Sequence, residues 1–465
     1  MILHRFFPQL SRLAMRAYYR FEMAGPPVPA RGPLLLVANH PNSLLDPACV
    51  CAVAGRPVRF LAKAPLFQDP LVGWLVRSAG AIPVYRRRDD PSLMSRNQEM
   101  FRAVHEALAA GEAVGLFPEG TSHSEPAMAP LRTGAARIAL EAAVAVGGAF
   151  PIVPVGLVLR EKDRFRSHAL ALAGEPVPWE DLQRAGAGSA EAVRELTSRI
   201  DAGLRDVTLN LERWEDAPVV ECVEGIYAVE FDLPGRPEER VRRLRKISEG
   251  LSRLRRSEPE RVGPLYRALS RYAGLLRTLE LSPGELRGCG PSSRAARRWT
   301  LRQLLFFGLV APLAALGAVV FFVPYRLTDL IPSRTGVEKD VTSSYKLLGG
   351  IVIYGAWTVL IATAVAWRAG PWLALAAVPL LLGLGLVTVA TRDRWAQTRA
   401  DARRYLLLRR RDRVRERLLE RRRELARRLE ALREEMARTP SAPATPAPPR
   451  YSPSPAASRP PGRTR

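Results

Sequence analysis

Histidine and cysteine are scarce in this sequence, with five and four residues among 465. The cysteines are Cys49, Cys51, Cys222 and Cys289, and apart from one C-x-C pair in an apolar run they lack the close spacing of a metal site. Intracellular proteins keep such thiols reduced. We therefore expect reduced core cysteines, no structural metal, and a folded part that faces the cytosol.

Acidic residues are also in deficit, because 46 Asp and Glu oppose 70 Lys and Arg and leave a net charge of +24. An excess of this size indicates a polyanionic neighbour, either nucleic acid or the surface of an anionic membrane. The remaining composition, with 47% hydrophobic and 25% charged residues, is that of an ordinary folded protein long enough for two or three units.

The N-terminus lacks the uninterrupted apolar core and the small-residue cleavage site of a signal peptide. Residues 1–30 are instead expected to form an amphipathic helical segment, in which arginines alternate with Ile2, Phe6, Leu10 and Leu13. Such a helix either lies in the headgroup region of a bilayer or packs on the rest of the protein, and the sequence favours neither arrangement.

Apolar runs alternate with helical patterns between Gly32 and Asp206, which predicts a mixed α/β domain over residues 31–215. A helix is expected over residues 92–110. The expected strands are residues 34–38, 58–62, 81–85, 113–117, 152–158 and 169–173.

The stretch VANHPNSLLDP places His40 and Asp46 just beyond the expected strand 34–38. In α/β folds, ligands bind at the edge where parallel strands end. An imidazole can take a proton near neutral pH, and a nearby carboxylate fixes its tautomer and stabilises the imidazolium. We expect such a pair to activate a hydroxyl; the structural alternative is that His40 caps a turn and Asp46 begins the next helix.

Three further stretches combine an apolar strand with residues that a hydrophobic core does not require, namely prolines, arginines or the sequence EGTS. They are GAIPVYRRR (80–88), GLFPEGTS (115–122) and PIVPVGL (151–157). The first runs out into arginines that begin with Arg86, and the second ends in Glu119, Gly120 and Thr121. Their recurrence favours the functional interpretation of His40 and Asp46.

Taken in order, the four stretches resemble the glycerolipid acyltransferases, the family that includes the glycerol-3-phosphate and 1-acylglycerol-3-phosphate acyltransferases. The resemblance covers residues 33–177, and the ordered set is specific although each motif alone is weak. It implies a mixed sheet with helices on both faces. Five residues separate His40 from Asp46 where the commonest family pattern has four, and this spacing, like the segment REKDRFRS (160–167), resembles the branch of the yeast-type glycerol-3-phosphate and dihydroxyacetone-phosphate acyltransferases.

The resemblance also implies roles for the residues that match its motifs. His40 resembles the general base that deprotonates the acceptor hydroxyl, and Asp46 resembles the carboxylate that orients it. The residues that resemble ligands of the acceptor and its phosphate are Arg86, Glu119, Gly120 and Thr121.

Acyl transfer requires a base and cationic or hydrogen-bonding groups, so the chemistry of the reaction supports the same residue types independently of the resemblance. Acyl transfer from a thioester to an alcohol needs a base and donors for the developing oxyanion, and it needs no metal. A phosphate-bearing acceptor calls for cationic side chains, and Arg132 is a further candidate. The resemblance adds Lys63, which is expected to face the phosphates of the acceptor or of the donor. Solvated surface charge is an equal interpretation of Arg87 and Arg88. His123, close behind FPEGTS, is open to two interpretations: a group that supports the site or, as favoured here, a loop histidine that faces solvent.

Beyond the α/β domain the pattern becomes helical. Residues 216–300 are expected to form an accessory helical segment, with two or three charged, leucine-spaced helices over residues 239–286. This segment carries no catalytic motif, so the sequence does not disclose its role.

Three runs of about twenty residues without a charge follow, at 304–323, 347–367 and 371–390, and each is long enough to cross a hydrocarbon core. The last two are split by only three residues, so they are expected to form a tight hairpin. Three crossings would place the arginine-dense segment opposite the catalytic domain, against the positive-inside tendency. We therefore expect residues 304–323, which contain Pro312, to dip into the bilayer without crossing or to pack beneath the domain.

Residues 393–438 are predicted to form one long arginine-rich helix. Its leucines, among them Leu418, Leu425 and Leu429, are compatible with self-association as a coiled coil, and its charge fits anionic lipid headgroups. The tail, residues 439–465, is rich in Pro, Ser and Ala and is expected to be disordered.

Two classes of function follow. In the first, the chain is an O-acyltransferase of phospholipid biosynthesis, integral to the cytoplasmic membrane with its catalytic domain facing the cytoplasm. The acceptor is then glycerol 3-phosphate, its 1-acyl derivative or a related lysophospholipid, the co-substrate is acyl-CoA or an acyl carrier protein, and no cofactor is needed. In the second, it is a catalytically silent membrane scaffold or nucleic-acid-tethering protein. The five motif residues His40, Asp46, Arg86, Glu119 and Gly120 favour the first, because a lipid-facing helix explains the arginines without nucleic acid.

Overall fold

A seven-stranded mixed sheet forms the centre of the N-terminal half. The computed structural model describes residues 2–86, 89–159, 161–286, 293–335, 342–410 and 412–438. The strands are β1 (Arg20–Ala24), β2 (Leu34–Ala38), β3 (Val58–Lys63), β4 (Ile82–Val84), β5 (Ala113–Leu116), β6 (Ile152–Leu159) and β7 (His168–Ala173). Their order is β1-β7-β6-β2-β5-β3-β4, with β6 and β7 antiparallel and the other neighbours parallel.

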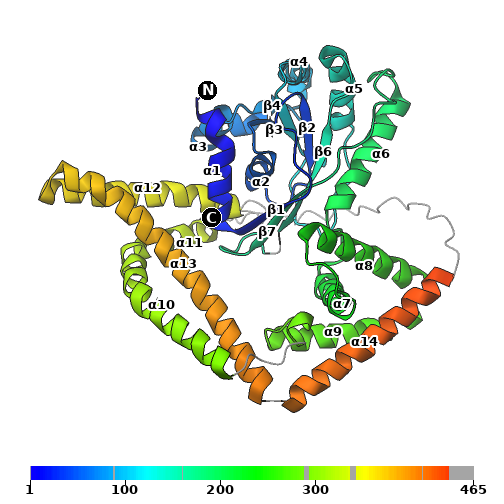
Figure 1. Cartoon of the computed structure of the whole chain (residues 1–465). Coiled ribbons are helices and arrows are strands. Elements are labelled where there is room, and N and C mark those ends of the chain that lie inside the picture. The colour runs from blue at the N-terminus through cyan, green and yellow to red at the C-terminus, as the bar shows by residue number, and fades with distance from the viewer. Residues whose placement is uncertain are drawn as a thin grey trace, which may run out of the picture.

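The central strand β2 is buried on both faces, and its alternating side chains divide between two cores. Leu35 and Val37 pack against one helical layer, whereas Leu34 and Leu36 pack against the other. The first layer contains α4 (Asn97–Ala109), α5 (Gly134–Val146) and α6 (Ala190–Val207), and the second contains α1 (Ile2–Tyr18) and α2 (Leu45–Ala54). Figure 1 shows the sheet between these layers. The predicted fold class, helices on both faces of a mixed sheet, is confirmed.

The remaining elements of this half are short. They are the 3-10 turns η1 (Ala64–Gln68) and η2 (Pro91–Arg96) and the helix α3 (Pro70–Ser78). The prediction for residues 92–110 is thus correct for its larger part, which is α4, and wrong for its beginning, which is η2.

The N-terminal segment departs from the predicted helix after Tyr18. Residues Arg20–Ala24 form the edge strand β1, which pairs with β7. Helix α1 packs on α2 through buried Met15 and Tyr18, while Phe6, Leu10 and Leu13 remain exposed. The sequence left open whether this helix packs on the protein or lies in a bilayer surface. The structure is compatible with both, because one face of α1 is packed on the domain and the opposite face is exposed.

Accessory helices follow the α/β domain. They are η3 (Trp214–Asp216), α7 (Ala217–Glu230), α8 (Pro237–Ser257), α9 (Pro259–Thr278) and η4 (Pro283–Leu286). Their core includes Leu418 and Leu425 of α14 (Asp412–Arg438), with Leu429 packed against it. The buried guanidinium of Arg422 anchors α14 further by donating to Glu230 and to the backbone oxygen of Pro283. These leucines are occupied within the chain, which removes the basis for the predicted self-association.

Four helices form the apolar part. They are α10 (Ser293–Val320), α11 (Phe322–Thr335), α12 (Thr342–Ala369) and α13 (Pro371–Arg410). Three of them contain segments long and apolar enough to cross a membrane, as predicted: Arg294–Val320, Ser344–Ala369 and Pro371–Leu406. Gly370, with φ +92°, forms the tight turn between α12 and α13.

The arginine-rich segment is not one helix from residue 393. Its first part continues α13 as far as Arg410, and α14 begins at Asp412. In Figure 1 the two helices meet at an angle, and α14 turns back and crosses α9 obliquely. Packing of the leucine face on α7 and α9 accounts for the change in direction. The predicted disordered tail, residues 439–465, lies outside the described residues.

Candidate active site

His40 and Asp46 meet at the carboxyl end of β2. The ring nitrogen Nδ1 of His40 lies 2.8 Å from Oδ2 of Asp46, and the backbone N–H of Asn42 donates to the same oxygen at 2.7 Å. Asp46 is fully buried in the first turn of α2. Burial raises the pKa of its carboxyl group, while the bonds from His40 and Asn42 act in the opposite direction. The structural alternative was partly right, because Asp46 does begin a helix, but its side chain is directed at His40.

Two asparagines hold this loop in place. The side chain of Asn39 donates to the backbone oxygen of Leu157 at 3.0 Å and accepts from its N–H at 2.7 Å, so the end of β2 stays attached to β6. Buried Asn42 donates to the hydroxyl of Tyr19, which donates to the backbone oxygen of Lys162. Lys162 in turn donates to the oxygen of Pro41. The sequence analysis missed these contacts, because nothing in the local pattern reports which distant segment faces a loop.

Glu119 accepts hydrogen bonds from the backbone of two separate segments, one of which contains His40. Its carboxylate, on a residue only 3% exposed, accepts from the N–H of His40 at 2.8 Å and from the N–H of Ala129 at 2.6 Å. A third bond, at 2.5 Å, joins it to Nε2 of His123. Both carboxylate oxygens are thus bonded to the chain itself, so the geometry favours a positioning role over the predicted contact with the acceptor.

His123 is not the solvent-facing loop histidine that the sequence suggested. Its bond to Glu119 raises the pKa of the imidazole, and burial opposes that effect. Its backbone N–H also donates to the oxygen of His40 at 3.2 Å. His123 therefore belongs to the framework that fixes the backbone of His40.

Two arginines converge on Gly120. Arg86 donates to the backbone oxygen of Gly120 at 3.5 Å and binds Asp89 through two bonds of 2.7 and 2.9 Å. Gly120 has φ +73°, and a side-chain carbon there would lie 2.6 Å from Nε of Arg132. Arg132 is exposed and forms no ion pair with any residue that the structure describes. Thr121 follows directly in the chain, so four of the predicted substrate-binding residues lie together.

The other predicted cations are less well defined. Lys63 is exposed at the carboxyl end of β3, where it is paired in register with Val84 of the neighbouring strand, two residues before Arg86. It therefore lies at the predicted edge of the sheet. Arg87 and Arg88 lie outside the described residues.

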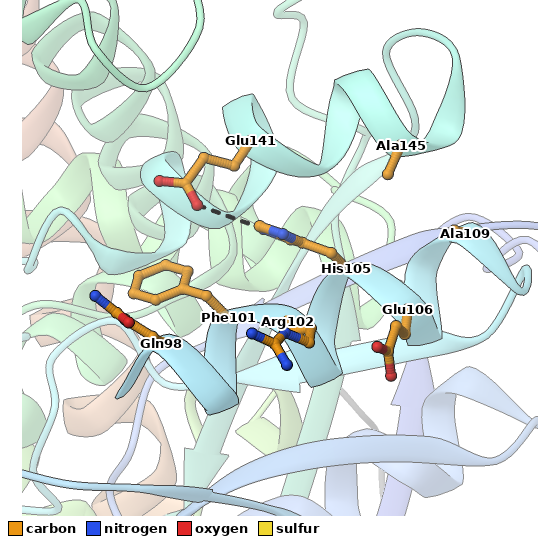
Figure 2. Close-up of a pocket in the computed structure, with 8 residues that line it drawn as sticks. All are labelled: Gln98, Phe101, Arg102, His105, Glu106, Ala109, Glu141 and Ala145. Carbon is orange, nitrogen blue, oxygen red and sulfur yellow. Dashed lines mark ion pairs between the residues drawn. The ribbon is translucent and has the colours of Figure 1, made fainter. Parts of the chain in front are cut away.

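A cavity of about 610 Å³ is present elsewhere, between α4 and α5 (Figure 2). His105 and Glu141 lie across it as an ion pair, with 3.6 Å between the charged atoms. None of its lining residues belongs to the His40 site, so this cavity is separate from the candidate active site.

Within the described residues, no group of three His, Cys, Asp or Glu side chains could hold a metal ion. Cys49, Cys51 and Cys222 are free and buried. Burial raises the pKa of Cys51 and of Cys222 to about 12, so both remain protonated thiols.

Fold and site together describe an α/β protein with a His–Asp pair at its sheet edge, bonded to Glu119, next to the glycine on which Arg86 and Arg132 converge. Residues 20–158 match the family model described as Acyltransferase, so the chain carries an acyltransferase-family domain. The resemblance predicted from the four motifs is thereby confirmed.

Individual relatives agree with this assignment. Glycerol-3-phosphate O-acyltransferases 2 and 1 of Saccharomyces cerevisiae are 25% and 26% identical over 284 residues, which cover 57% and 56% of this chain and 36% and 37% of theirs. A lyso-ornithine lipid O-acyltransferase of Pseudomonas aeruginosa is 34% identical over 137 residues, 30% of this chain and 49% of its own. The chain thus spans little more than a third of the length of the yeast relatives.

Proposed function

We propose that this protein is a membrane-bound O-acyltransferase that moves an acyl group from a thioester to the hydroxyl of glycerol 3-phosphate or a 1-acyl lysophospholipid. The observation that carries the proposal is the bond between His40 and buried Asp46 at the sheet edge of an acyltransferase-family domain. No observation in the described residues favours the alternative of a silent scaffold.

The proposed reaction begins at Nε2 of His40. With Nδ1 donating to Asp46, the tautomer leaves a lone pair on Nε2 to take the acceptor's hydroxyl proton. The acceptor oxygen then forms a bond to the thioester carbonyl carbon, and the carbon–sulfur bond breaks as the tetrahedral intermediate collapses. The proton passes from His40 to the departing thiolate, so the side chain returns to its starting state.

The acceptor's phosphate is proposed to bind at the cationic corner formed by Arg132, Arg86 and Gly120. Arg132 supports this most strongly, because its guanidinium has no anionic partner among the described residues and is therefore a ready phosphate ligand. Arg86 already binds Asp89, so it offers less free charge. Acyl-CoA or an acyl carrier protein is proposed as the donor co-substrate, with no cofactor.

We also propose that the protein is integral to the cytoplasmic membrane, with the catalytic domain on the cytoplasmic side and both ends of the α12–α13 hairpin on that side. Leu347, near the start of α12, packs against the core of the α/β domain, and Asp393 of α13 pairs with its Arg166. Trp367 and Trp372 flank the turn at the other end and are exposed, as interfacial tryptophans are.

Helix α10 is proposed to enter the bilayer and stop near its middle. It runs antiparallel to α13, since Gln303 bonds Arg394 and Ala314 bonds Thr388. Its end at Val320 lies beside Trp357, ten residues beyond Leu347 and therefore about 15 Å into a core roughly 30 Å thick. The indole N–H of Trp357 donates to the backbone oxygen of Val320 at 2.9 Å. This bond satisfies a carbonyl group at the helix end for which lipid tails offer no hydrogen-bond donor.

Helix α11 then returns along α12 toward the catalytic domain. Asp329 of α11 pairs with Lys346 at the start of α12, at 3.5 Å. Helices α10 and α11 thus enter and leave on one side, and only α12 and α13 cross. This arrangement keeps the arginines that follow the apolar part of α13 on the side of the catalytic domain.

The activity is tested with purified full-length protein in mixed vesicles and a radiolabelled acyl thioester. The acceptor panel contains glycerol 3-phosphate, 1-acylglycerol 3-phosphate and lyso-ornithine lipid, which lacks a phosphate. Transfer to a phosphate-bearing acceptor supports the proposal. Transfer to no acceptor, from either acyl-CoA or acyl carrier protein, would refute it.

A further inference from the structure

Three stacked rings form a column, and the first of them is the imidazole of the proposed base His40. The imidazole of His40 stacks on Phe117 with 4.0 Å between ring centroids and 9° between planes. Phe117 stacks in turn on Phe60, at 5.8 Å and 15°. His40 is therefore held in its plane by Asp46 and against its face by an aromatic ring.

A glycine makes room for this column. Phe60 of β3 lies directly opposite Gly115 of β5, and a side-chain carbon at Gly115 would lie 2.5 Å from the Phe60 ring. The ring covers the glycine, as aromatic residues do across a sheet. Phe117 follows Gly115 by two residues and so projects from the same face. The register of β2 with β5, in which Val37 pairs with Leu116, brings His40 beside it.

We propose that Phe117, seated on Phe60 and Gly115, is a positioning residue for the proposed base His40. The inference rests on the proposed acyl transfer. A single bond to Asp46 restrains one ring nitrogen but leaves the imidazole free to tilt, and the stack removes that freedom. Proton transfer depends on the alignment of Nε2 with the acceptor hydroxyl, so a tilt slows the reaction.

The stack also suits the charge that forms during the reaction. When His40 takes the proton, the imidazolium lies over the face of Phe117, and a cation is attracted to the face of an aromatic ring. The acceptor and the donor in their ground states gain nothing from this contact. Loss of the ring is therefore expected to lower kcat rather than to raise either KM.

The experiment compares three variants of the full-length protein in vesicles. Phe117→Leu, which keeps an apolar side chain but no ring face, is expected to lower kcat about tenfold with both KM values unchanged. Phe117→Tyr, which restores the ring, should return kcat to within about twofold of the native value. Phe150→Leu is the matched control, because Phe150 is a buried aromatic of the same domain that packs on Trp179 away from His40.

A coupled pair of variants tests the support of the column. Gly115→Ala displaces the Phe60 ring, so it is expected to lower kcat in the native background. In a Phe60→Ala background the added methyl group meets no ring, and Gly115→Ala should then have little further effect.

The outcomes separate this inference from the proposed function. If the native protein transfers acyl groups and Phe117→Leu keeps the native kcat, the positioning role is wrong and the acyltransferase stands. The same holds if Phe150→Leu lowers kcat as much as Phe117→Leu, since the effect is then one of general stability. If the native protein transfers no acyl group, the proposed function itself fails.

Discussion

Arg166 and Asp393, 227 residues apart in the sequence, are hydrogen-bonded, with Nε of Arg166 donating to Oδ2 of Asp393 at 2.8 Å. Arg166 also donates to the backbone oxygens of Arg16 and Tyr19 at the end of α1. One side chain thus connects the amphipathic helix, the β1–β7 edge of the sheet and the end of a membrane helix. This contact fixes which end of α13 faces the catalytic domain.

The proposed topology makes a prediction for chemical labelling. Cys289 is first replaced by serine, because the other cysteines, Cys49, Cys51 and Cys222, are buried. Single cysteines are then introduced at exposed positions. Ala185→Cys and Ala431→Cys should react with an impermeant maleimide from the same side of sealed vesicles, and Ala369→Cys from the opposite side. Val319→Cys, near the middle of the bilayer, should react from neither side. Reaction of Ala431→Cys and Ala185→Cys from opposite sides would contradict the two-crossing arrangement.

Strands β2 to β7 were predictable because each is a largely apolar run. The expected strand 34–38 coincides with β2, and five others differ from β3 to β7 by at most one residue at each end. The edge strand β1 was missed since RFEMA is only partly buried, and its charges continue the pattern of the preceding helix. Leucine spacing in α14 correctly indicates a buried face, but it cannot say that the partner is α7 and α9 rather than a second copy.

The motif residues of the site could be predicted because their residue types and their positions at the ends of strands indicate what they can do chemically. The sequence therefore led to the prediction of His40, Asp46 and Arg86 as site residues. The contacts made by Tyr19 and Phe117 depend on how segments far apart in the chain come together, and no local pattern encodes that. The hydrogen bonds of Glu119 were not predicted for the same reason, because their donors come from three separate positions.

Removal of the proposed base should abolish most turnover. His40→Ala is expected to lower kcat by roughly two to four orders of magnitude, because general base catalysis contributes about that much. Asp46→Asn keeps the shape but offers no carboxylate to the imidazole, and a loss of at least about a hundredfold is expected. Membrane insertion, measured by carbonate extraction, should be unchanged in both. Native turnover in His40→Ala would rule out the proposed mechanism.

Arg132 is expected to act on acceptor binding. Arg132→Ala should raise the KM for glycerol 3-phosphate or its 1-acyl derivative about tenfold or more, with the KM for the acyl donor unchanged, since a charged hydrogen bond to phosphate is lost. Arg137→Ala is the matched control, because Arg137 is also exposed, lies at the start of α5 and has its guanidinium bonded to Thr133. A rise in the donor KM alone would reassign the cationic corner to the donor.

Arg86→Ala should have the smaller effect of the two arginine variants. Asp89 already holds the Arg86 guanidinium through two bonds, so part of its charge is neutralised before a phosphate arrives. The expected rise in acceptor KM is about threefold. Asp89→Asn should lower the acceptor KM by freeing Arg86, and an increase instead would show that Asp89 supports the phosphate site.

Stability should depend on pH in opposite directions at two histidines. The bond from Glu119 raises the pKa of His123 above the ordinary value of 6.5, so the folded protein binds this proton more tightly than the unfolded chain. The stabilisation is complete below about pH 6.5 and is lost as the pH rises through the raised pKa. Tm measured in detergent for native protein should therefore exceed that of His123→Gln by roughly 2 °C at pH 6, and by less at pH 9. A difference in Tm between native protein and His123→Gln that widens toward alkaline pH would mean that the bond to Glu119 does not favour the imidazolium.

His105 should show the opposite dependence. Burial lowers the pKa of His105, so native protein should gain stability relative to His105→Gln as the pH rises toward 6.5.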